Sequence, residues 1–262
     1  MNKRLWLVLS MALSAPACMR AQSAFDGTWK IDLNEARFST KPDVYLLRNG
    51  LWQCKSCVPP VNLKADGLDY KVANDDPCVE TSSVKVIDDR TVEIIDKKSG
   101  RITNTSKGTV SSDGNTLTFE ESDACNPESQ RMTSEIEERR VSAGPVGSHV
   151  ISGSWRMIRA SASQNALKET LKVVGDRISY IDAAGESFTA KLDGTYTPII
   201  GDPDRSIVSV KREGKNTLIE TIRQNGSVVE VRRRPVKPDG KTMTITFSGT
   251  ESGVDTVVAR KQ

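Results

Sequence analysis

The chain has 262 residues, 37 Lys and Arg against 34 Asp and Glu, and only 5% aromatic residues. Its formal net charge of +3 gives no sign of a polyanionic partner, so nucleic acid is not an expected ligand. The single histidine, His149, excludes a histidine-rich metal site, and any triad that needs an imidazole would have to use it.

The first 24 residues have the layout of a secretory signal peptide. A basic segment at 2–4 precedes an apolar run at 5–13, which is too short to span a bilayer, and small residues follow. Cleavage after Ala17 or after Ala24 fits this pattern. A lipid anchor at Cys18 is the less favoured alternative, because the preceding residues lack the usual Leu of a lipoprotein signal. We therefore expect an exported protein, periplasmic or extracellular, with no transmembrane span.

The rest of the chain reads as two similar halves. Residues 25–148 carry 16 basic and 21 acidic residues, whereas residues 149–262 carry 18 and 13. FDGTWKIDL begins at Phe25 and ISGSWRMIR at Ile151, and three further pairs of similar segments follow in the same order. This pattern predicts an internal duplication, with domains at 25–142 and 151–262 joined by a Gly-, Ser- and Pro-containing linker at 143–150.

Each half is a series of short runs in which apolar and polar residues alternate. Turn sequences such as Asp113-Gly114 and Asn225-Gly226 separate the runs at intervals near ten residues, which leaves no room for crossover helices. The fold class predicted is all-β, with two tandem antiparallel up-and-down β-barrels, because closure removes exposed sheet edges.

The Gly-x-Trp sequence that opens each half resembles the start of the first strand in the lipocalin and fatty-acid-binding-protein superfamily. The resemblance implies that Trp29 and Trp155 close the barrel floors, each under a basic residue from late in its own half. The candidates are Arg139 or Arg140 in the first half and Arg260 in the second. Through the CKSC-VPP segment at 54–60 and the GPVGSHVISGSW segment at 144–155, the chain also resembles a group of exported proteins of soil bacteria, which brings no activity with it.

Four cysteines follow the signal segment, at Cys54, Cys57, Cys78 and Cys125. The C-x-x-C spacing occurs in redox sites, but those need a helix N-terminus that is not predicted here. A Cys₄ zinc site would require all four to converge. We favour two structural disulfides, Cys54–Cys57 and Cys78–Cys125, because the strands next to the second pair would begin and end at the same end of a four-strand meander.

Several other polar residues could have either a structural or a functional role. No residue is assigned as catalytic. His149 lies in the linker and is expected to be an exposed polar residue. Glu220 and Glu230 flank a hairpin turn and could serve as acid and base, but outward ion pairs with Arg223, Arg232 or Arg233 are favoured. The basic run at 232–234 with Lys237 fits an anion or headgroup contact, or, as favoured here, a charged edge strand. The segment 201–204 is too short for a calcium loop.

These observations favour a non-enzymatic exported protein that binds a small hydrophobic or amphipathic ligand in one barrel, with no metal and no cofactor. The second half carries the fuller apolar strand faces and is the expected location, since the strand at 101–110 is polar on nearly both faces. One alternative is a structural or protein-interaction module of the envelope with solid barrel cores. An enzyme with carboxylates at a barrel mouth is less favoured.

Overall fold

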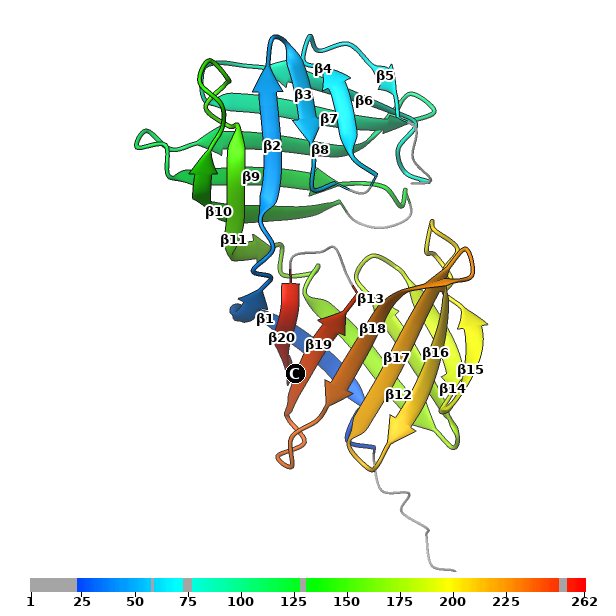
Figure 1. Cartoon of the computed structure of the whole chain (residues 1–262). Coiled ribbons are helices and arrows are strands. Elements are labelled where there is room, and N and C mark those ends of the chain that lie inside the picture. The colour runs from blue at the N-terminus through cyan, green and yellow to red at the C-terminus, as the bar shows by residue number, and fades with distance from the viewer. Residues whose placement is uncertain (1–22, 58, 73–76, 128–130, 250–253) are drawn as a thin grey trace, which may run out of the picture.

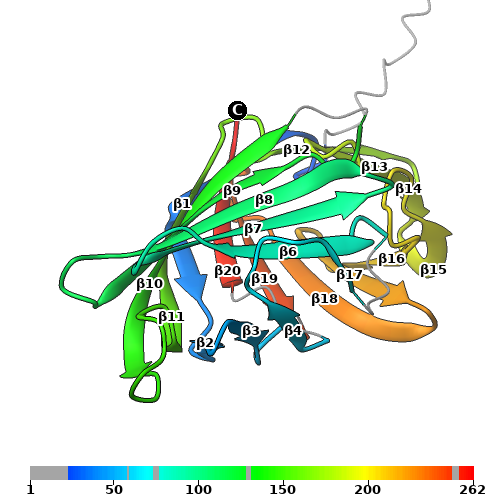
Figure 2. The same ribbon diagram turned by 90° about the horizontal axis from the view of Figure 1, so that it is seen from above.

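The computed structural model describes residues 23–57, 59–72, 77–127, 131–249 and 254–262. Within these residues the chain is all-β, with twenty strands, no helix, and two ten-stranded antiparallel sheets that each nearly close into a barrel (Figures 1 and 2). This confirms the predicted fold class. The described residues therefore include no helix long and apolar enough to cross a bilayer. The expected signal segment through residue 22, with Cys18, lies outside them.

One sheet, called here the first barrel, has the strand order β4-β3-β2-β11-β10-β9-β8-β7-β6-β5. Two short strands, β4 and β5, form its ends, and an isolated bridge between Asp66 and Lys85 links the segment between them to β6. Its strands are β2 (Asp43–Arg48), β3 (Leu51–Cys54), β4 (Val61–Lys64), β5 (Tyr70–Lys71), β6 (Thr81–Val86), β7 (Thr91–Lys98), β8 (Arg101–Val110), β9 (Thr116–Asp123), β10 (Met132–Ala143) and β11 (Gly153–Ala162).

The other sheet, called the second barrel, has the order β14-β13-β12-β1-β20-β19-β18-β17-β16-β15. A bridge between Ser187 and Ile200 links β14 to the segment after β15. Its strands are β1 (Gly27–Phe38), β12 (Lys168–Val174), β13 (Arg177–Asp182), β14 (Ser187–Lys191), β15 (Asp193–Pro198), β16 (Ile207–Glu213), β17 (Thr217–Gln224), β18 (Ser227–Pro235), β19 (Thr242–Ser248) and β20 (Val254–Lys261).

The two strands that begin with Gly-x-Trp lie in the opposite barrels from those expected. β1 pairs with β12 and β20, and β11 pairs with β10 and β2. The first barrel is therefore continuous in sequence, from β2 to β11, and it is inserted between β1 and β12 of the second. This corrects the expected domains at 25–142 and 151–262, and the expected linker at 143–150 lies mostly within the β10–β11 connection. Both strands carry the same short motif, so the motif does not specify which sheet each one completes.

The spatial strand orders of the two barrels correspond position by position. Trp155 lies opposite Arg140 on one side and Asp43 on the other, and Trp29 lies opposite Lys261 and Glu169 in the same way. Each barrel is thus a circular permutation of the other. This correspondence agrees with the predicted duplication, which remains an interpretation of the sequence.

Tight turns set the register of the hairpins. Asn225 and Gly226 have φ of 49° and 83°, a left-handed conformation that Asn and Gly adopt at low cost. They join β17 to β18 with Gln224 opposite Ser227, as the sequence predicts. Ser99 and Gly100 make the corresponding turn between β7 and β8.

Each barrel has its own apolar core, and alternation along the strands accounts for it. The core of the first barrel is built from Leu47, Trp52, Leu63, Val84, Val92, Val110, Leu117, Phe119, Ile151 and Trp155. The core of the second is built from Phe25, Trp29, Leu171, Ile178, Tyr180, Phe188, Ala190, Val208, Val210, Leu218, Ile222, Val236, Met243, Ile245, Val257 and Ala259.

The tryptophans are fully buried in these cores, but a different basic residue packs on each one than expected. The Arg140 guanidinium carbon lies 3.9 Å from the Trp155 ring centre, and Lys261 Nζ lies 4.8 Å from that of Trp29. Arg260, which was expected to pack on Trp155, instead forms an exposed ion pair with Glu35. Successive residues of a strand point to opposite faces, so Lys261 faces inward and Arg260 outward.

Steric crowding explains why the Gly-x-Trp motif of the first barrel begins with glycine. Gly153 has φ of 142°, and a Cβ atom there would lie 2.3 Å from the Ser142 carbonyl oxygen. The indole nitrogen of Trp155 donates to the Ile151 carbonyl at 2.8 Å, and that of Trp29 donates to Phe25 in the same way. A buried indole thus keeps its hydrogen bond at both floors.

Candidate functional site

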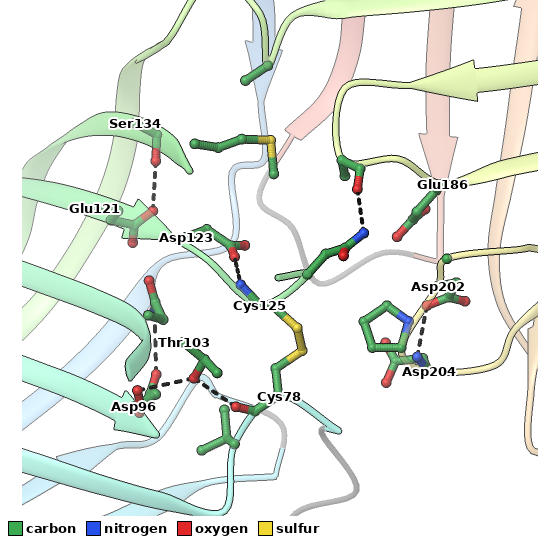
Figure 3. Close-up of a pocket in the computed structure, with 18 of the residues that line it drawn as sticks. Cys78, Asp96, Thr103, Glu121, Asp123, Cys125, Ser134, Glu186, Asp202 and Asp204 are labelled. Atoms are coloured by element: carbon green, nitrogen blue, oxygen red, sulfur yellow. Dashed lines mark hydrogen bonds between the residues drawn. A yellow bond between two sulfur atoms is a disulfide. The ribbon is translucent and has the colours of Figure 1, made fainter. Parts of the chain in front are cut away.

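A pocket of about 550 Å³ lies where the end of the first barrel faces turns of the second (Figure 3). Strands β7 to β10 form one wall. The turns around residues 184–186 and 201–204 form the other. The lining side chains combine apolar groups with carboxylates: Cys78, Val79, Asp96, Thr103, Asn104, Glu121, Asp123, Cys125, Asn126, Met132, Thr133, Ser134, Ala162, Ala166, Ala184, Glu186, Gly201, Asp202, Pro203 and Asp204.

Alternation along the strands of the first barrel places the side chains of this pocket wall. On β9, Leu117 and Phe119 lie in the core, and Glu121 continues the same face to the mouth. Ser134 of β10 donates to Glu121 Oε2 at 3.0 Å. Burial raises the pKa of Glu121, the Ser134 hydrogen bond opposes this, and the charge of Asp123 adds to it. The mouth therefore presents an inward carboxyl that is poorly solvated.

The second-barrel wall consists of tight turns that carry acidic residues. Asp202 accepts hydrogen bonds from the backbone nitrogens of Asp204 at 2.9 Å and Ser206 at 2.8 Å. Burial, followed by the charges of Asp182 and Asp202, raises the pKa of Glu186 to about 7, although Arg232 opposes the shift. This wall is thus also rich in negative charge.

A direct hydrogen bond ties the two walls together. Asn126 Nδ2 donates to the Ala184 carbonyl at 3.0 Å, and this bond bridges the connection after β9 and the turn after β13. Figure 3 shows labelled carboxylates of the two barrels on either side of this space, with Asp123 on one side and Glu186 on the other. The pocket therefore depends on residues far apart in the sequence.

Deeper in the first barrel, a second carboxyl group lies on the inward face of β10. Glu138 is 2% exposed, and its Oε2 has no hydrogen-bond partner among the described residues. Burial, with the charge and hydrogen bond of Asp43 and the charge of Glu121, raises the pKa of Glu138 to about 9. Burial and the nearby carboxylates also raise the pKa of Tyr45. At neutral pH Glu138 therefore keeps its proton.

The second barrel has a buried charge cluster in which one guanidinium group lies against two carboxyl groups. Arg234 Nη1 lies 2.7 Å from Glu169 Oε1, and Arg234 Nε lies 2.9 Å from Glu220 Oε1, an ion pair without good hydrogen-bond geometry. Arg234 and Glu220 are each 1% exposed. The two carboxylates raise the pKa of Arg234 against the effect of its burial. This cluster is a structural ion pair that holds its own counter-charge.

The cluster corrects two expectations about this region. Glu220 was expected to point outward, and the basic run at 232–234 was expected to mark an edge strand. Instead β18 lies between β17 and β19, and Arg234 points into the barrel, while Arg233 alone faces out toward Glu213. Alternation predicts that Arg232 and Arg234 share a face, but it does not tell which face is interior. Glu230 forms an ion pair with Arg232.

The cysteines form the two disulfides favoured from the sequence, Cys54–Cys57 and Cys78–Cys125. The C-x-x-C pair follows strand β3 and precedes no helix, so the structural context of a thioredoxin-type site is missing. The described residues hold no group of three or more His, Cys, Asp or Glu that could bind a metal ion. Two disulfides are the state expected in an oxidising compartment.

The His149 ring makes hydrogen bonds that connect two loops. One ring nitrogen, Nε2, lies 2.9 Å from the Asp88 carbonyl oxygen, and Nδ1 accepts from the Ile151 backbone nitrogen at 3.2 Å. This arrangement requires the tautomer that carries its proton on Nε2. The ring thus holds the β10–β11 connection against the turn between β6 and β7.

The pocket carboxylates were not identified from the sequence. The available signal was an acidic residue at an inward position of an alternating strand, as in the Leu117, Phe119, Glu121 series. For Asp202 and Asp204 the sequence suggests only a calcium loop, for which segment 201–204 is too short. A local pattern does not show that these two regions face each other.

The fold and the site define an all-β protein of two near-closed barrels with an acidic pocket at the mouth of the first. Comparisons of the chain with family models, with curated proteins and with solved structures found no match.

Replacing Glu138 by Gln is expected to change how stability depends on pH. The folded protein holds the Glu138 proton up to about pH 9, whereas the unfolded chain releases it near 4.5, so this group lowers stability as pH rises through that window. We expect E138Q to be more stable than the wild type at pH 8 by about 1–3 kcal/mol. At pH 4 the two should be nearly equal.

Urea unfolding across this pH range measures the effect. Glu137→Gln is the matched control, because Glu137 points outward to Arg159 at 2.9 Å. Parallel pH profiles for E138Q and the wild type would show that Glu138 is not a buried, protonated group.

Removal of the Cys78–Cys125 disulfide by double substitution to Ala is expected to lower the unfolding free energy by about 4 kcal/mol. The two residues are separated by 47 positions, so the bond restricts a long loop in the unfolded chain. The Cys54–Cys57 bond spans only 3 positions, and its removal should cost about 2 kcal/mol. Thermal unfolding of both variants under oxidising conditions tests this order, and an equal or reversed effect would contradict it.

Proposed function

We propose that this protein is exported to the periplasm or the cell exterior and binds a small amphipathic ligand without catalysing a reaction. The pocket between the barrels is the observation that supports the proposal. Its volume of about 550 Å³ is in the range of small-molecule sites, and its walls combine Met132, Ala162 and Pro203 with carboxylates. Such a lining suits a ligand with both an apolar and a polar part.

The pocket at the first barrel is favoured over the second barrel, although the sequence led us to expect the reverse. The centre of the second barrel is occupied by Arg234 and its two carboxylate partners. A further depression of about 620 Å³ lies against β12 to β14, where Lys172, Ser179 and Thr189 belong to the outer face. That depression offers less protection from solvent, so the second barrel is proposed to serve as the support for one wall of the pocket.

Binding is favoured over catalysis by the partners of the reactive-looking groups. Ser134 donates to Glu121, and His149 lies elsewhere, bonded to Asp88. Within the pocket lining that the structure describes there is thus no hydroxyl placed against an imidazole. A lipocalin-like mode of binding at a barrel mouth is part of this proposal.

Native mass spectrometry of gently purified protein tests the proposal. We expect one small adduct per chain, and its loss in Ala166→Trp, which places an indole in the pocket. Val146→Trp is the control, because Val146 is 96% exposed on the β10–β11 connection. Protein that carries no adduct from any envelope or culture extract would contradict ligand binding, and an adduct that survives A166W would exclude this pocket.

A further inference from the structure

The two barrels differ in the charge of equivalent inward positions. Gly108 of β8 lies opposite Val92, and Arg234 of β18 lies opposite Leu218, at matching places in the two strand orders. By the same registers, Ser106 corresponds to Arg232. The first barrel therefore has no guanidinium group at the positions that Arg232 and Arg234 occupy in the second. A Cβ at residue 108 would lie 2.6 Å from the Phe119 ring, so the glycine makes room for that ring.

The acidic partner of the missing guanidinium is nevertheless retained. Asp43 lies opposite Trp155 as Glu169 lies opposite Trp29. In the second barrel Glu169 is neutralised by Arg234 at 2.7 Å. In the first barrel the neighbour of Asp43 is another carboxyl group, Glu138, which is buried and holds an unpartnered Oε2. The first barrel therefore has two neighbouring carboxyl groups here, of which Glu138 is protonated at neutral pH, and no guanidinium at the position of Arg234.

Acidic side chains continue from Glu138 toward the pocket. Ser134, Ile136 and Glu138 follow one another on the inward face of β10, so Glu138 lies below the mouth that Ser134 lines. None of the described residues that line the pocket is Lys or Arg. Six of them are carboxylates from both barrels: Asp96, Glu121, Asp123, Glu186, Asp202 and Asp204.

The arrangement of these carboxylates favours an organic cation over a metal ion. They are spread around a pocket of about 550 Å³, and the described residues contain no cluster able to hold a metal. The apolar side chains of Met132 and Pro203 line the same space. A metal ion requires several oxygens within about 2.6 Å of one point, whereas an alkylammonium group can be held by carboxylates farther apart while its carbon chain contacts the apolar wall.

We propose that the ligand of this pocket is a small organic cation, with a protonated amine or guanidinium facing the carboxylates of both barrels and a short apolar part. This inference rests on the proposed ligand-binding function and adds the charge of the ligand.

Three probes of equal chain length separate charge from apolar contact: hexylammonium, 1-hexanol and hexanoate. Each is titrated into the full-length exported protein, and the amide resonances of Glu121, Ser134 and Glu186 are followed by NMR. We expect hexylammonium to shift these resonances and to bind at least about tenfold more tightly than hexanol, with no binding of hexanoate. Calcium chloride is the fourth probe and should leave the three resonances unchanged.

Glu121→Gln and Glu120→Gln are the matched variants. Glu121 faces the pocket, whereas Glu120 is its outward neighbour, 3.8 Å from Lys107. We expect E121Q to weaken hexylammonium binding about five- to tenfold and E120Q to leave it unchanged. Glu186→Gln provides the same test from the second barrel should E121Q fail to fold.

The outcomes distinguish the two proposals. Equal or tighter binding of hexanol or hexanoate at the same resonances would overturn the cationic ligand and leave ligand binding intact. Calcium binding there would overturn the organic nature of the cation. If none of the probes moves these resonances, the cationic ligand is overturned, and the adduct measurement decides the proposed function separately.

Discussion

A fragment of residues 40–163 is expected to fold on its own, whereas a fragment of residues 25–142 is not. The first fragment contains all strands from β2 to β11, which form one complete sheet. The second lacks β11 with Trp155 and also lacks the core residue Ile151 that precedes this strand, and it carries β1 without the barrel it completes. Loss of a buried Trp alone typically costs about 3–5 kcal/mol, and loss of β11 also exposes the edges of β2 and β10.

Near-ultraviolet circular dichroism and cooperative urea unfolding would measure this difference. The complementary fragment, residues 164–262, should gain structure only when a peptide of residues 23–40 supplies β1 with Phe25 and Trp29. A peptide with Trp29→Ala is the control and should bind much more weakly. A cooperatively folded fragment 25–142 would contradict the strand arrangement described for β1 and β11.

Replacing Arg234 by Met is expected to lower the unfolding free energy by about 3–5 kcal/mol. The substitution keeps much of the side-chain volume but leaves Glu169 and Glu220 buried without a cation. Breaking a buried ion pair by removing one partner is costly, because the remaining charges stay desolvated. Urea unfolding at neutral pH measures the effect.

The neighbouring residue provides the control for this substitution. Arg233→Met removes an outward, exposed ion pair with Glu213 and should cost less than about 1 kcal/mol. Adding Glu169→Gln and Glu220→Gln to R234M should recover part of the loss, since no ionised carboxylate then remains in the cluster. Equal effects of R234M and R233M would show that the buried cluster contributes little.

The sequence predicted features that depend on neighbouring residues. Asn225-Gly226 specifies a tight turn through its own backbone preferences, and alternation in runs such as that around Val208 and Val210 specifies a strand with one buried face. The cysteine pairing followed from where Cys78 and Cys125 stand relative to nearby strands. Fold class, many of the strands and both disulfides could therefore be derived from local patterns.

The site could not be derived in the same way, because its charges come from distant segments. Alternation places Arg232 and Arg234 on one face but does not tell whether this face is interior, so the same run also fits a charged edge strand. Glu121 and Asp202 meet across one pocket although some 80 residues separate them, and no local pattern relates them.

By itself, then, the sequence determined an all-β chain of hairpins with Trp29 and Trp155 at buried strand starts. Only the tertiary structure decided that β1 completes the second barrel and β11 the first. The physical reason is that a strand can form the same backbone hydrogen bonds with any neighbouring strand whose apolar and polar residues alternate in the same way. The choice between two similar sheets depends on the complete packing of each barrel, and the same packing decides which carboxylates face the pocket.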